Sequence, residues 1–414
     1  MAWAPLALLL VTAATVTTAA TAATAATAGN RHSTNIAEDA RLNVPALVRK
    51  YGYPLEEHTV VTSDGYVLTA HRIPHARGER PVLPGAGART PVLVMHGLMC
   101  SSADFLVLGP GSALGYLLAD AGYDVWLANA RGNYYSRRHL SLDPDERERL
   151  DFWRFSWDEI GERDLPALVE HVSAISGRRR MHYVGYSQGT TAFLVMAALR
   201  PEYGARFLSF QALAPAAFNE YSDNPARDEL MQYESLLDAI AFSNGFGEVL
   251  RRRPLFADLG LQHCADGAEL QELCAQALTG GSQHVNRTLL PVFAGHNPAG
   301  AALRQIIHYA QVQRFGRFAR YNFDPVTNMA RYGSLRPPEY DVTRVTTPTH
   351  LHYGLGDANS LPANVRLLAR RMGARAVLHA VPRASFNHFD FIWASDARAQ
   401  LYEPVLALLR RHDE

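Results

Sequence analysis

The spacing of hydrophobic and polar positions changes several times along the chain, and each change predicts an element. Residues 58–74 contain two alternating, β-branched runs around Asp64-Gly65, which predicts a hairpin because Asp-Gly favours a tight turn. Continuous apolar runs predict strands that are buried on both faces, at 91–95, 123–129, 181–186 and 207–215. Helical spacing separates these runs, at 112–121, 156–175 and 188–199, and Ser156 with Glu159 forms a capping box.

This alternation stops at about residue 218 and resumes after residue 341. The block between is mostly helical in pattern, with irregular Pro and Gly breaks. Beyond it we expect a strand at 347–354, a helix at 363–372, a strand at 374–382 and an amphipathic helix at 396–412. Repeated strand–helix units predict an α/β fold with a mostly parallel sheet and helices on both faces. We therefore expect one core, residues 31–217 and 342–414, interrupted by a helical insertion, residues 218–341.

Residues 1–30 are interpreted as a secretory leader. Their apolar run, 5–16, is too short to cross a bilayer, and Ala and Thr then alternate without charge. The leader lacks the usual basic start, so a low-complexity leader is the alternative. No later segment is predicted to span a membrane. A secretory route predicts a secreted or lysosomal protein, in which Asn286 of Asn286-Arg287-Thr288 could carry a glycan and Cys264 and Cys274 could pair.

The amino-acid composition argues against several kinds of binding site and partner. The chain has 414 residues and a formal net charge of zero, so no basic field indicates nucleic acid as a partner. Lys50 is the only lysine, and it lacks the glycines of a phosphate-binding loop. Three cysteines are too few for a four-thiolate metal site. We therefore expect an enzyme that uses ordinary side chains, without a cofactor or a metal.

Residues 185–189, Gly-Tyr-Ser-Gln-Gly, join a predicted buried strand to a predicted helix. This is the strand–turn–helix setting of a nucleophile elbow, in which the hydroxyl of Ser187 projects at the carboxyl edge of the sheet. A structural serine in a turn is the alternative. Two donors must stabilise the oxyanion, and we assign them to the backbone N–H groups of Gln188 and of Leu98, which follows the strand 91–95. The neighbouring His96 is interpreted as a structural loop residue.

A nucleophilic serine needs a base that is oriented by an acid. Asp357 and His388 each follow a predicted strand, and the loops after neighbouring parallel strands share one edge of the sheet. We assign Asp357 as the acid and His388 as the base. Asp390 is a minor alternative for the acid. Histidines in the insertion are interpreted as surface or packing residues: His263, His284, His296 and His308.

These motifs together resemble the acid lipase family of the α/β-hydrolases, which includes gastric and lysosomal acid lipases. The resemblance extends over about residues 35–412 and depends on the following segments: YGYPLEEHTVVTSDGYVL, HGLMCSSADF, LADAGYDVWLANARGN, FSWDEIGERDLPA, HYVGYSQGTT, GHNPAG, YGLGDAN and FNHFDFIWA. It implies an esterase for neutral lipids, such as triacylglycerol or sterol esters, with a helical cap over the site. It also implies the roles of Ser187, Asp357, His388, Leu98 and Gln188, and a cap cysteine pair that matches Cys264 and Cys274.

The chain departs from the family pattern at three points. Tyr186 replaces the histidine that usually precedes the nucleophile, the glycine–lysine before Asp357 is missing, and Cys100 lies beside the oxyanion loop. Two alternatives to a lipase remain open: a carboxylesterase for small soluble esters, and an inactive lipid-binding protein of the same fold. The family implies an acidic working pH, at which the 17 histidines would raise the charge to at most +17 if all were protonated. The sequence indicates neither the acyl chain nor the oligomeric state.

Overall fold

The computed structural model describes residues 31–79, 89–146, 148, 150–222, 229 and 233–413. The predicted leader, residues 1–30, lies outside these described residues. Among the described helices, none has both the length and the apolar character to cross a bilayer.

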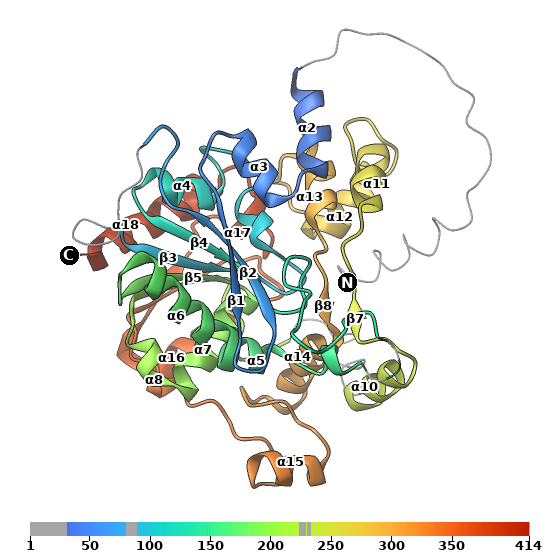
Figure 1. The fold of residues 1–414 in the computed structure, drawn as a ribbon, viewed down its shortest axis with the longest axis vertical. Helices are drawn as coiled ribbons and strands as arrows, with labels where there is room; N and C mark the ends of the chain where they lie inside the picture. Colours follow the sequence, from blue (N-terminus) through green and yellow to red (C-terminus); the bar gives the residue numbers. More distant parts are fainter. Residues whose placement is uncertain are drawn as a thin grey trace.

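An eight-stranded sheet forms the centre of the molecule (Figure 1), in the order β1-β2-β4-β3-β5-β6-β9-β10. The predicted hairpin pairs β1 with β2, and β2 runs antiparallel to β4, whereas every pairing from β4 to β10 is parallel. The predicted mostly parallel α/β sheet is therefore confirmed. Its strands are β1 (Glu56–Val61), β2 (Val67–Ile73), β3 (Pro91–Met95), β4 (Asp124–Ala128), β5 (Met181–Tyr186), β6 (Phe207–Leu213), β9 (Thr349–Tyr353) and β10 (Ala376–Ala380).

Both faces of the sheet are covered by helices, because successive side chains of a strand point to opposite sides. In β3, Leu93 and Met95 join one hydrophobic cluster, and Val92 and Val94 join the other. The first cluster lies under α6 (Leu165–Ser176), α7 (Gln188–Leu199) and α16 (Pro362–Met372). The second lies under α3 (Val44–Lys50), α4 (Leu114–Asp120) and α18 (Glu403–Asp413).

The predicted helix 156–175 differs in detail from the structure. The capping box of Ser156 and Glu159 is present, but α5 (Trp157–Glu159) passes through a π-helical turn, Ile160–Asp164, before α6 begins. Pro166 has no N–H to donate within a regular helix, which favours this irregular turn. Gly161 allows a close approach to α7, since a Cβ there would lie 2.6 Å from the side chain of Val195. The last predicted helix likewise starts with a π-helical turn, Arg398–Tyr402, before α18.

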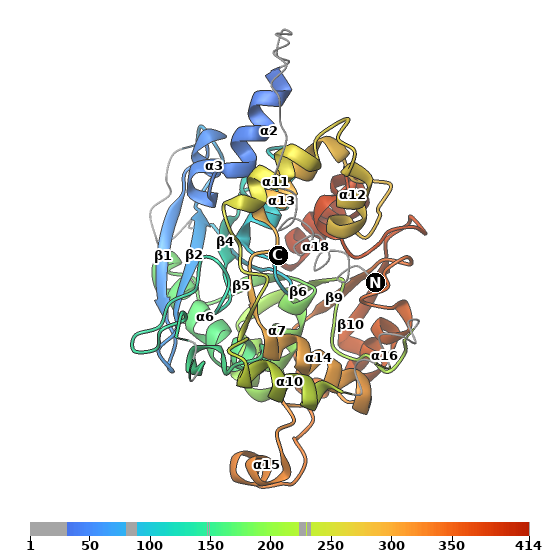
Figure 2. The ribbon, with the colours of Figure 1, turned by 90° about the vertical axis from the view of Figure 1, so that its right-hand side faces the viewer.

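Between β6 and β9 the described chain is mainly helical, and Figure 2 shows these helices in two groups, one above the strands and one below them. They are α10 (Glu234–Ser243), α11 (Leu255–His263), α12 (Gln271–Thr279), α13 (Leu290–His296), α14 (Leu303–Phe315) and α15 (Pro325–Tyr332), with β7 (Glu248–Val249) and β8 (Ala301–Ala302) as a two-stranded sheet. Helix α2 (Arg31–Arg41), which the sequence pattern does not predict, packs on α13 and α11. Two short helices, α8 (Pro201–Gly204) and α17 (Asp390–Trp393), complete the fold.

Candidate active site

Ser187 lies in a tight turn between β5 and α7, as the elbow motif predicts. Its backbone has φ of 50° and ψ of −117°, a left-handed φ that a side-chain-bearing residue rarely adopts. Two glycines make room for the turn: a Cβ on Gly189 would lie 2.3 Å from the carbonyl oxygen of Met95, and one on Gly185 would lie 2.8 Å from the backbone of Gly189. The Ser187 amide donates to the Leu213 carbonyl across the neighbouring strand, at 2.9 Å. The strained conformation is therefore held by its surroundings.

The structure brings Ser187, His388 and Asp357 together. Nε2 of His388 lies 2.9 Å from Oγ of Ser187, and Nδ1 of His388 lies 2.8 Å from Oδ2 of Asp357. Asp357 follows β9 and is buried, and its other oxygen, Oδ1, accepts from the amides of Asn359 and Ser360, at 2.8 Å each. This carboxylate is thus fixed in place while one oxygen remains directed at the imidazole.

Asp390, the minor alternative for the acid, faces elsewhere. Its carboxylate accepts from the Ser282 hydroxyl at 2.5 Å, from the Asn387 amide at 2.9 Å and from the Arg383 guanidinium at 3.1 Å. These contacts tie the loop that carries His388 to the insertion without orienting the imidazole.

The insertion histidines lie in other contacts. His296 and His308 are buried. Nε2 of His296 lies 2.8 Å from the Asp39 carbonyl oxygen, and Nε2 of His308 lies 3.0 Å from the Ala319 carbonyl oxygen. His284 lies 2.9 Å from the Ser385 hydroxyl, and His263 ends α11 half-buried.

Tyr186, which replaces the histidine usual in the family, contacts His388 in two ways. Its hydroxyl donates to the backbone carbonyl of His388 at 3.0 Å, and its ring lies 5.2 Å from the imidazole between centroids. The sequence marks this position only as a departure from the family pattern. In the structure, the phenol hydroxyl fixes the loop that carries His388.

The loop after β3 packs directly against the elbow. A Cβ on Gly97 would lie 3.1 Å from Cβ of Ser187, so glycine allows this approach, and Leu98 lines the same cavity as Ser187. His96 is buried: its Nδ1 donates to the Gly97 carbonyl at 2.7 Å, and its Nε2 accepts from the Ala130 amide at 3.1 Å. Burial lowers the pKa of His96 to about 4, so this imidazole stays neutral and serves as a brace for the loop.

Asp104 is a site residue that the sequence does not reveal. Its carboxylate accepts from the Ser101 amide at 2.7 Å and from the Asn297 side chain at 2.8 Å, which joins the loop after β3 to the insertion. The Ala299 amide adds a second link, to the carbonyl of Met99 at 2.7 Å. Burial raises the pKa of Asp104 to about 6. The motif GHNPAG contains Asn297, but only the fold shows what it contacts.

Cys100 lies beside these links and lines the cavity at Ser187. Burial and the neighbouring Asp104 raise the pKa of the Cys100 thiol. A raised pKa lowers the thiolate fraction, so we expect this thiol to react slowly with thiol reagents.

A cavity of about 270 Å³ opens at Ser187 and His388. Much of its wall comes from the helices between β6 and β9, so these helices lie over the carboxyl edge of the sheet. Apolar side chains predominate, as an acyl chain would require, and the lining from this part of the chain includes Ala277 and Leu278 of α12, Pro298 after α13, and Ile306, Tyr309 and Ala310 of α14. Among the residues that the structure describes, no three His, Cys, Asp or Glu side chains are grouped to hold a metal ion.

Comparisons with known proteins assign this chain to a family. A family model described as a partial alpha/beta-hydrolase lipase region matches residues 44–109, and one for the alpha/beta hydrolase fold matches residues 90–239. The chain is 41% identical to Lipase 1 of Drosophila melanogaster over 385 residues, which is 92% of this chain and 82% of that protein. It is 34% identical to human gastric triacylglycerol lipase over 384 residues, which is 90% of this chain and 92% of that protein. This chain belongs to the acid lipase family of the α/β-hydrolases.

A solved structure agrees with this assignment at the level of the fold. The DcsB complex with its substrate analogue is 11% identical, with a TM-score of 0.51, over 87% of this chain and 100% of that chain. That likeness concerns the architecture alone.

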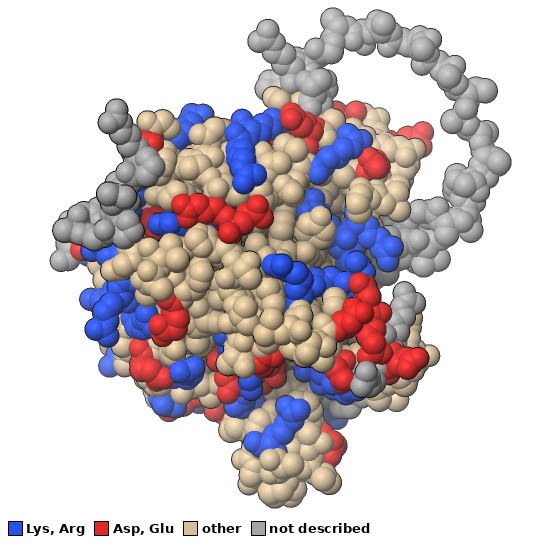
Figure 3. Space-filling model, viewed as in Figure 1, with Lys and Arg blue, Asp and Glu red and all other residues tan. Residues whose placement is uncertain are grey.

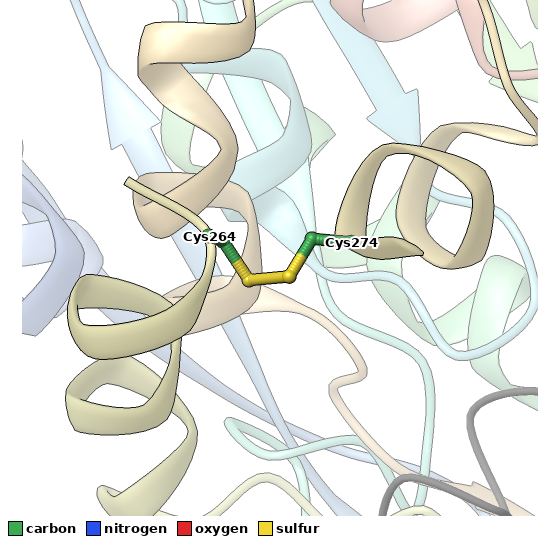
Figure 4. Close-up of a disulfide and its surroundings, with 2 residues drawn as sticks. All are labelled: Cys264 and Cys274. Atoms are coloured by element: carbon green, nitrogen blue, oxygen red, sulfur yellow. A yellow bond between two sulfur atoms is a disulfide. The ribbon is translucent and has the colours of Figure 1, made fainter. Parts of the chain in front are cut away.

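The acid lipase carries a disulfide between Cys264, which follows α11, and Cys274 of α12 (Figure 4), the pairing that the family resemblance implies. Both cysteines are buried. Helix α12 also supplies Ala277 and Leu278 to the cavity wall. The disulfide therefore fixes a helix that borders the cavity at Ser187.

The sequon of this acid lipase lies on the surface. Asn286 is exposed, and its side chain accepts from the Thr288 amide at 3.1 Å. The Thr288 hydroxyl donates to Asp266 at 2.8 Å.

Proposed function

We propose that this acid lipase hydrolyses carboxylic ester bonds of neutral lipids, triacylglycerols or sterol esters, through an acyl-enzyme on Ser187. One observation carries the proposal: the connected chain of Ser187, His388 and Asp357 opens into an apolar cavity walled by the insertion. This arrangement supplies a nucleophile, a base and an orienting acid next to a site for an acyl chain.

In the proposed mechanism, Nδ1–H of His388 donates to Asp357, which leaves Nε2 free to accept the hydroxyl proton of Ser187. Oγ then forms a bond to the ester carbonyl carbon, and the N–H groups of Leu98 and Gln188 stabilise the oxyanion. His388 returns the proton to the leaving alcohol as the ester C–O bond breaks. Water, deprotonated by His388, attacks the acyl carbon, and the bond from this carbon to Oγ then breaks as His388 returns the proton to Ser187, which releases the fatty acid. These steps use no metal and no organic cofactor.

Residues 218–341 would act as the cap of this site, between the two parts of the core, 31–217 and 342–414. The cavity residues of α12 and α14, together with Asn297 and Pro298 after α13, support this division, because these segments line the cavity at Ser187. A cap that moves at a lipid–water interface would admit a water-insoluble ester.

The protein would be secreted or lysosomal after removal of the leader 1–30. The exposed Asn286 and the Cys264–Cys274 disulfide support this route, since glycans and disulfides belong to the secretory pathway. A mobility shift on enzymatic deglycosylation should occur for the secreted parent and disappear in Asn286→Gln.

The function is tested with a substrate panel on the parent and Ser187→Ala. The parent should turn over emulsified long-chain esters and form a covalent adduct with a phosphonate at Ser187, and Ser187→Ala should do neither. Turnover restricted to short soluble esters would instead identify a carboxylesterase. A parent that forms no adduct and hydrolyses no ester would identify an inactive lipid-binding protein.

A further inference from the structure

Residues 318–340 form a finger that projects from the rest of the molecule, with α15 at its tip (Figures 1 and 2). Two antiparallel segments make its base: the Arg320 amide donates to the Pro338 carbonyl at 3.0 Å, and the Tyr340 amide donates to the Phe318 carbonyl at 2.8 Å. The guanidinium of Arg320 contacts Glu162 of the core, which anchors this base.

Hydrogen bonds within the finger fix the backbone at its tip. Asn328 is buried, and its side-chain amide donates to Asn322 at 2.8 Å and to the Leu335 carbonyl at 3.1 Å. The Asp324 carboxylate caps α15 by accepting from the amides of Val326 and Thr327, at 3.0 Å each. The side chains at the tip are therefore presented by a fixed backbone.

Apolar side chains occupy the outer surface of this finger. Val326 is 79% exposed, Leu335 59% and Met329 47%, and Phe315, at the end of α14, is 46% exposed. Single exposed apolar residues are ordinary, but a group of them on a projecting, internally tied element indicates a surface that is covered in use.

The charged side chains near these apolar residues indicate which kind of partner covers the surface. Over residues 314–341 the chain carries five arginines, four of which are exposed (Arg314, Arg317, Arg331 and Arg336), and three acidic residues, Asp324, Glu339 and Asp341. The difference, five minus three, is a local charge of +2 on a chain whose net charge is zero. Figure 3 shows the projecting end as mostly uncharged surface with basic side chains on it.

A groove of about 390 Å³ at the finger adds a second feature of the same kind. Phe315, Phe323 and Leu335 supply apolar wall, and Arg336 supplies a guanidinium. Apolar surface beside arginine suits an acyl chain and its anionic head group, as at a membrane interface.

We propose that the finger, residues 318–340 with Phe315, docks the enzyme on an anionic lipid–water interface. The proposal deepens the function proposed above and rests on it for the nature of the partner. Helix α14 connects the two sites, because Ile306, Tyr309 and Ala310 line the catalytic cavity and Phe315 ends the same helix at the finger. Fatty acids released by ester hydrolysis would themselves make the interface anionic.

Vesicle flotation tests this proposal, with Ser187→Ala as the parent so that no lipid is consumed. The probes are vesicles of phosphatidylcholine alone and of phosphatidylcholine mixed with phosphatidylglycerol. The variant Val326→Ser/Met329→Ser/Leu335→Ser should lower the partition coefficient about tenfold or more on both vesicles, since binding scales with buried apolar area. The variant Arg331→Gln/Arg336→Gln should lose the extra binding to the anionic vesicles while it keeps the binding to neutral ones.

A matched control is Val61→Ser/Leu140→Ser, which removes two exposed apolar side chains outside the finger, 48% and 70% exposed. It should bind like the parent. In a Ser187 background, all variants should turn over a soluble short-chain ester at the parental rate, which verifies the fold.

Parental vesicle binding by the triple variant would overturn the docking proposal, even with ester hydrolysis intact. If light scattering shows a dimer that the triple variant dissociates, the apolar face belongs to a second copy and the proposal is also overturned. Loss of vesicle binding in the triple variant supports docking, and it does so even if the wild type hydrolyses no ester, a result that would overturn the proposed function alone.

Discussion

At the scale of single residues, the two aspartates near His388 have separate tasks that substitution can distinguish. Asp357→Asn should lower kcat by about 10⁴-fold with little change in KM, because an amide at this position no longer holds the imidazole in the tautomer that accepts from Ser187. Steady-state kinetics on a soluble ester measures this effect, and the melting temperature should change little.

Asp390→Asn is the matched control, since Asp390 is as buried as Asp357 and lies two residues from His388 in the sequence. This substitution weakens the contacts with Arg383 and Ser282, so it should cost about 1–3 kcal/mol of unfolding free energy. The kcat should fall by less than about tenfold, since the imidazole keeps its partner. A loss of kcat in Asp390→Asn as large as in Asp357→Asn would contradict the proposed roles.

Asp104 and Asn297 should act as one unit behind the oxyanion loop. Removing either partner leaves a buried polar group of the other without its hydrogen bond. Asp104→Ala should lower kcat by about tenfold or more, because a small displacement of the loop misplaces the Leu98 N–H.

A double-mutant cycle with Asn297→Ala measures the coupling between them. We expect the two losses of kcat to be strongly non-additive, as for groups in direct contact. Additive losses would show that Asp104 acts on the loop without the insertion.

At the scale of elements, the disulfide should stabilise the wall of the cavity more than the core. The chain-entropy model gives roughly 2.5–3 kcal/mol for closing a loop of this length. The double substitution Cys264→Ser/Cys274→Ser should therefore increase hydrogen exchange in α11 and α12, while the strands of the central sheet keep their protection. Uniformly faster exchange across the sheet would contradict this local effect.

The elements that the sequence predicts are those whose signals are local. The strand 181–186, the turn at Ser187 and the helix 188–199 follow from an apolar run, two glycines and helical spacing, and the structure has them at these positions. The shared edge of parallel strands then predicts that Asp357 and His388 meet there, and the structure brings them to Ser187.

Other features depend on contacts between distant segments, and no local pattern reveals them. Asn297 meets Asp104 across 193 residues, and the Tyr186 hydroxyl reaches the backbone of His388 across 202. The finger escapes prediction for a different reason. Its apolar residues, such as Val326 and Leu335, face outward, whereas hydrophobic spacing is interpreted on the assumption that such residues face a core.

At the scale of the whole molecule, buried histidines lower the stability of the fold at acidic pH. Burial lowers the pKa of His71, His296 and His308 to about 3 and that of His96 to about 4. These imidazoles stay neutral at pH 5 while the protein is folded. The charge of +17 expected if all histidines were protonated is therefore too high for the native state.

The direction of the pH effect follows from these shifts. The unfolded chain binds protons at these four histidines below about pH 6.5, and the folded chain does not, so acid favours unfolding. Burial raises the pKa of the carboxyls of Asp104 and Asp158 to about 6, so the folded state takes up protons there first, which offsets part of this effect. Burial also lowers the pKa of His350 to about 4 and that of His352 well below its usual range, which adds to the effect. The free energy of unfolding therefore falls as the pH is lowered from about 6 to about 4.

Urea unfolding at pH 7, 6 and 5 measures this loss directly. The free energy of unfolding should be highest near pH 7 and should fall between pH 6 and pH 5. His296→Gln should reduce that slope by about 1.4 kcal/mol per pH unit, because it removes one imidazole that is protonated only on unfolding. A free energy of unfolding that is constant from pH 7 to pH 5 would contradict the argument, and the acid limit of activity would then lie in the catalytic residues instead of in the fold.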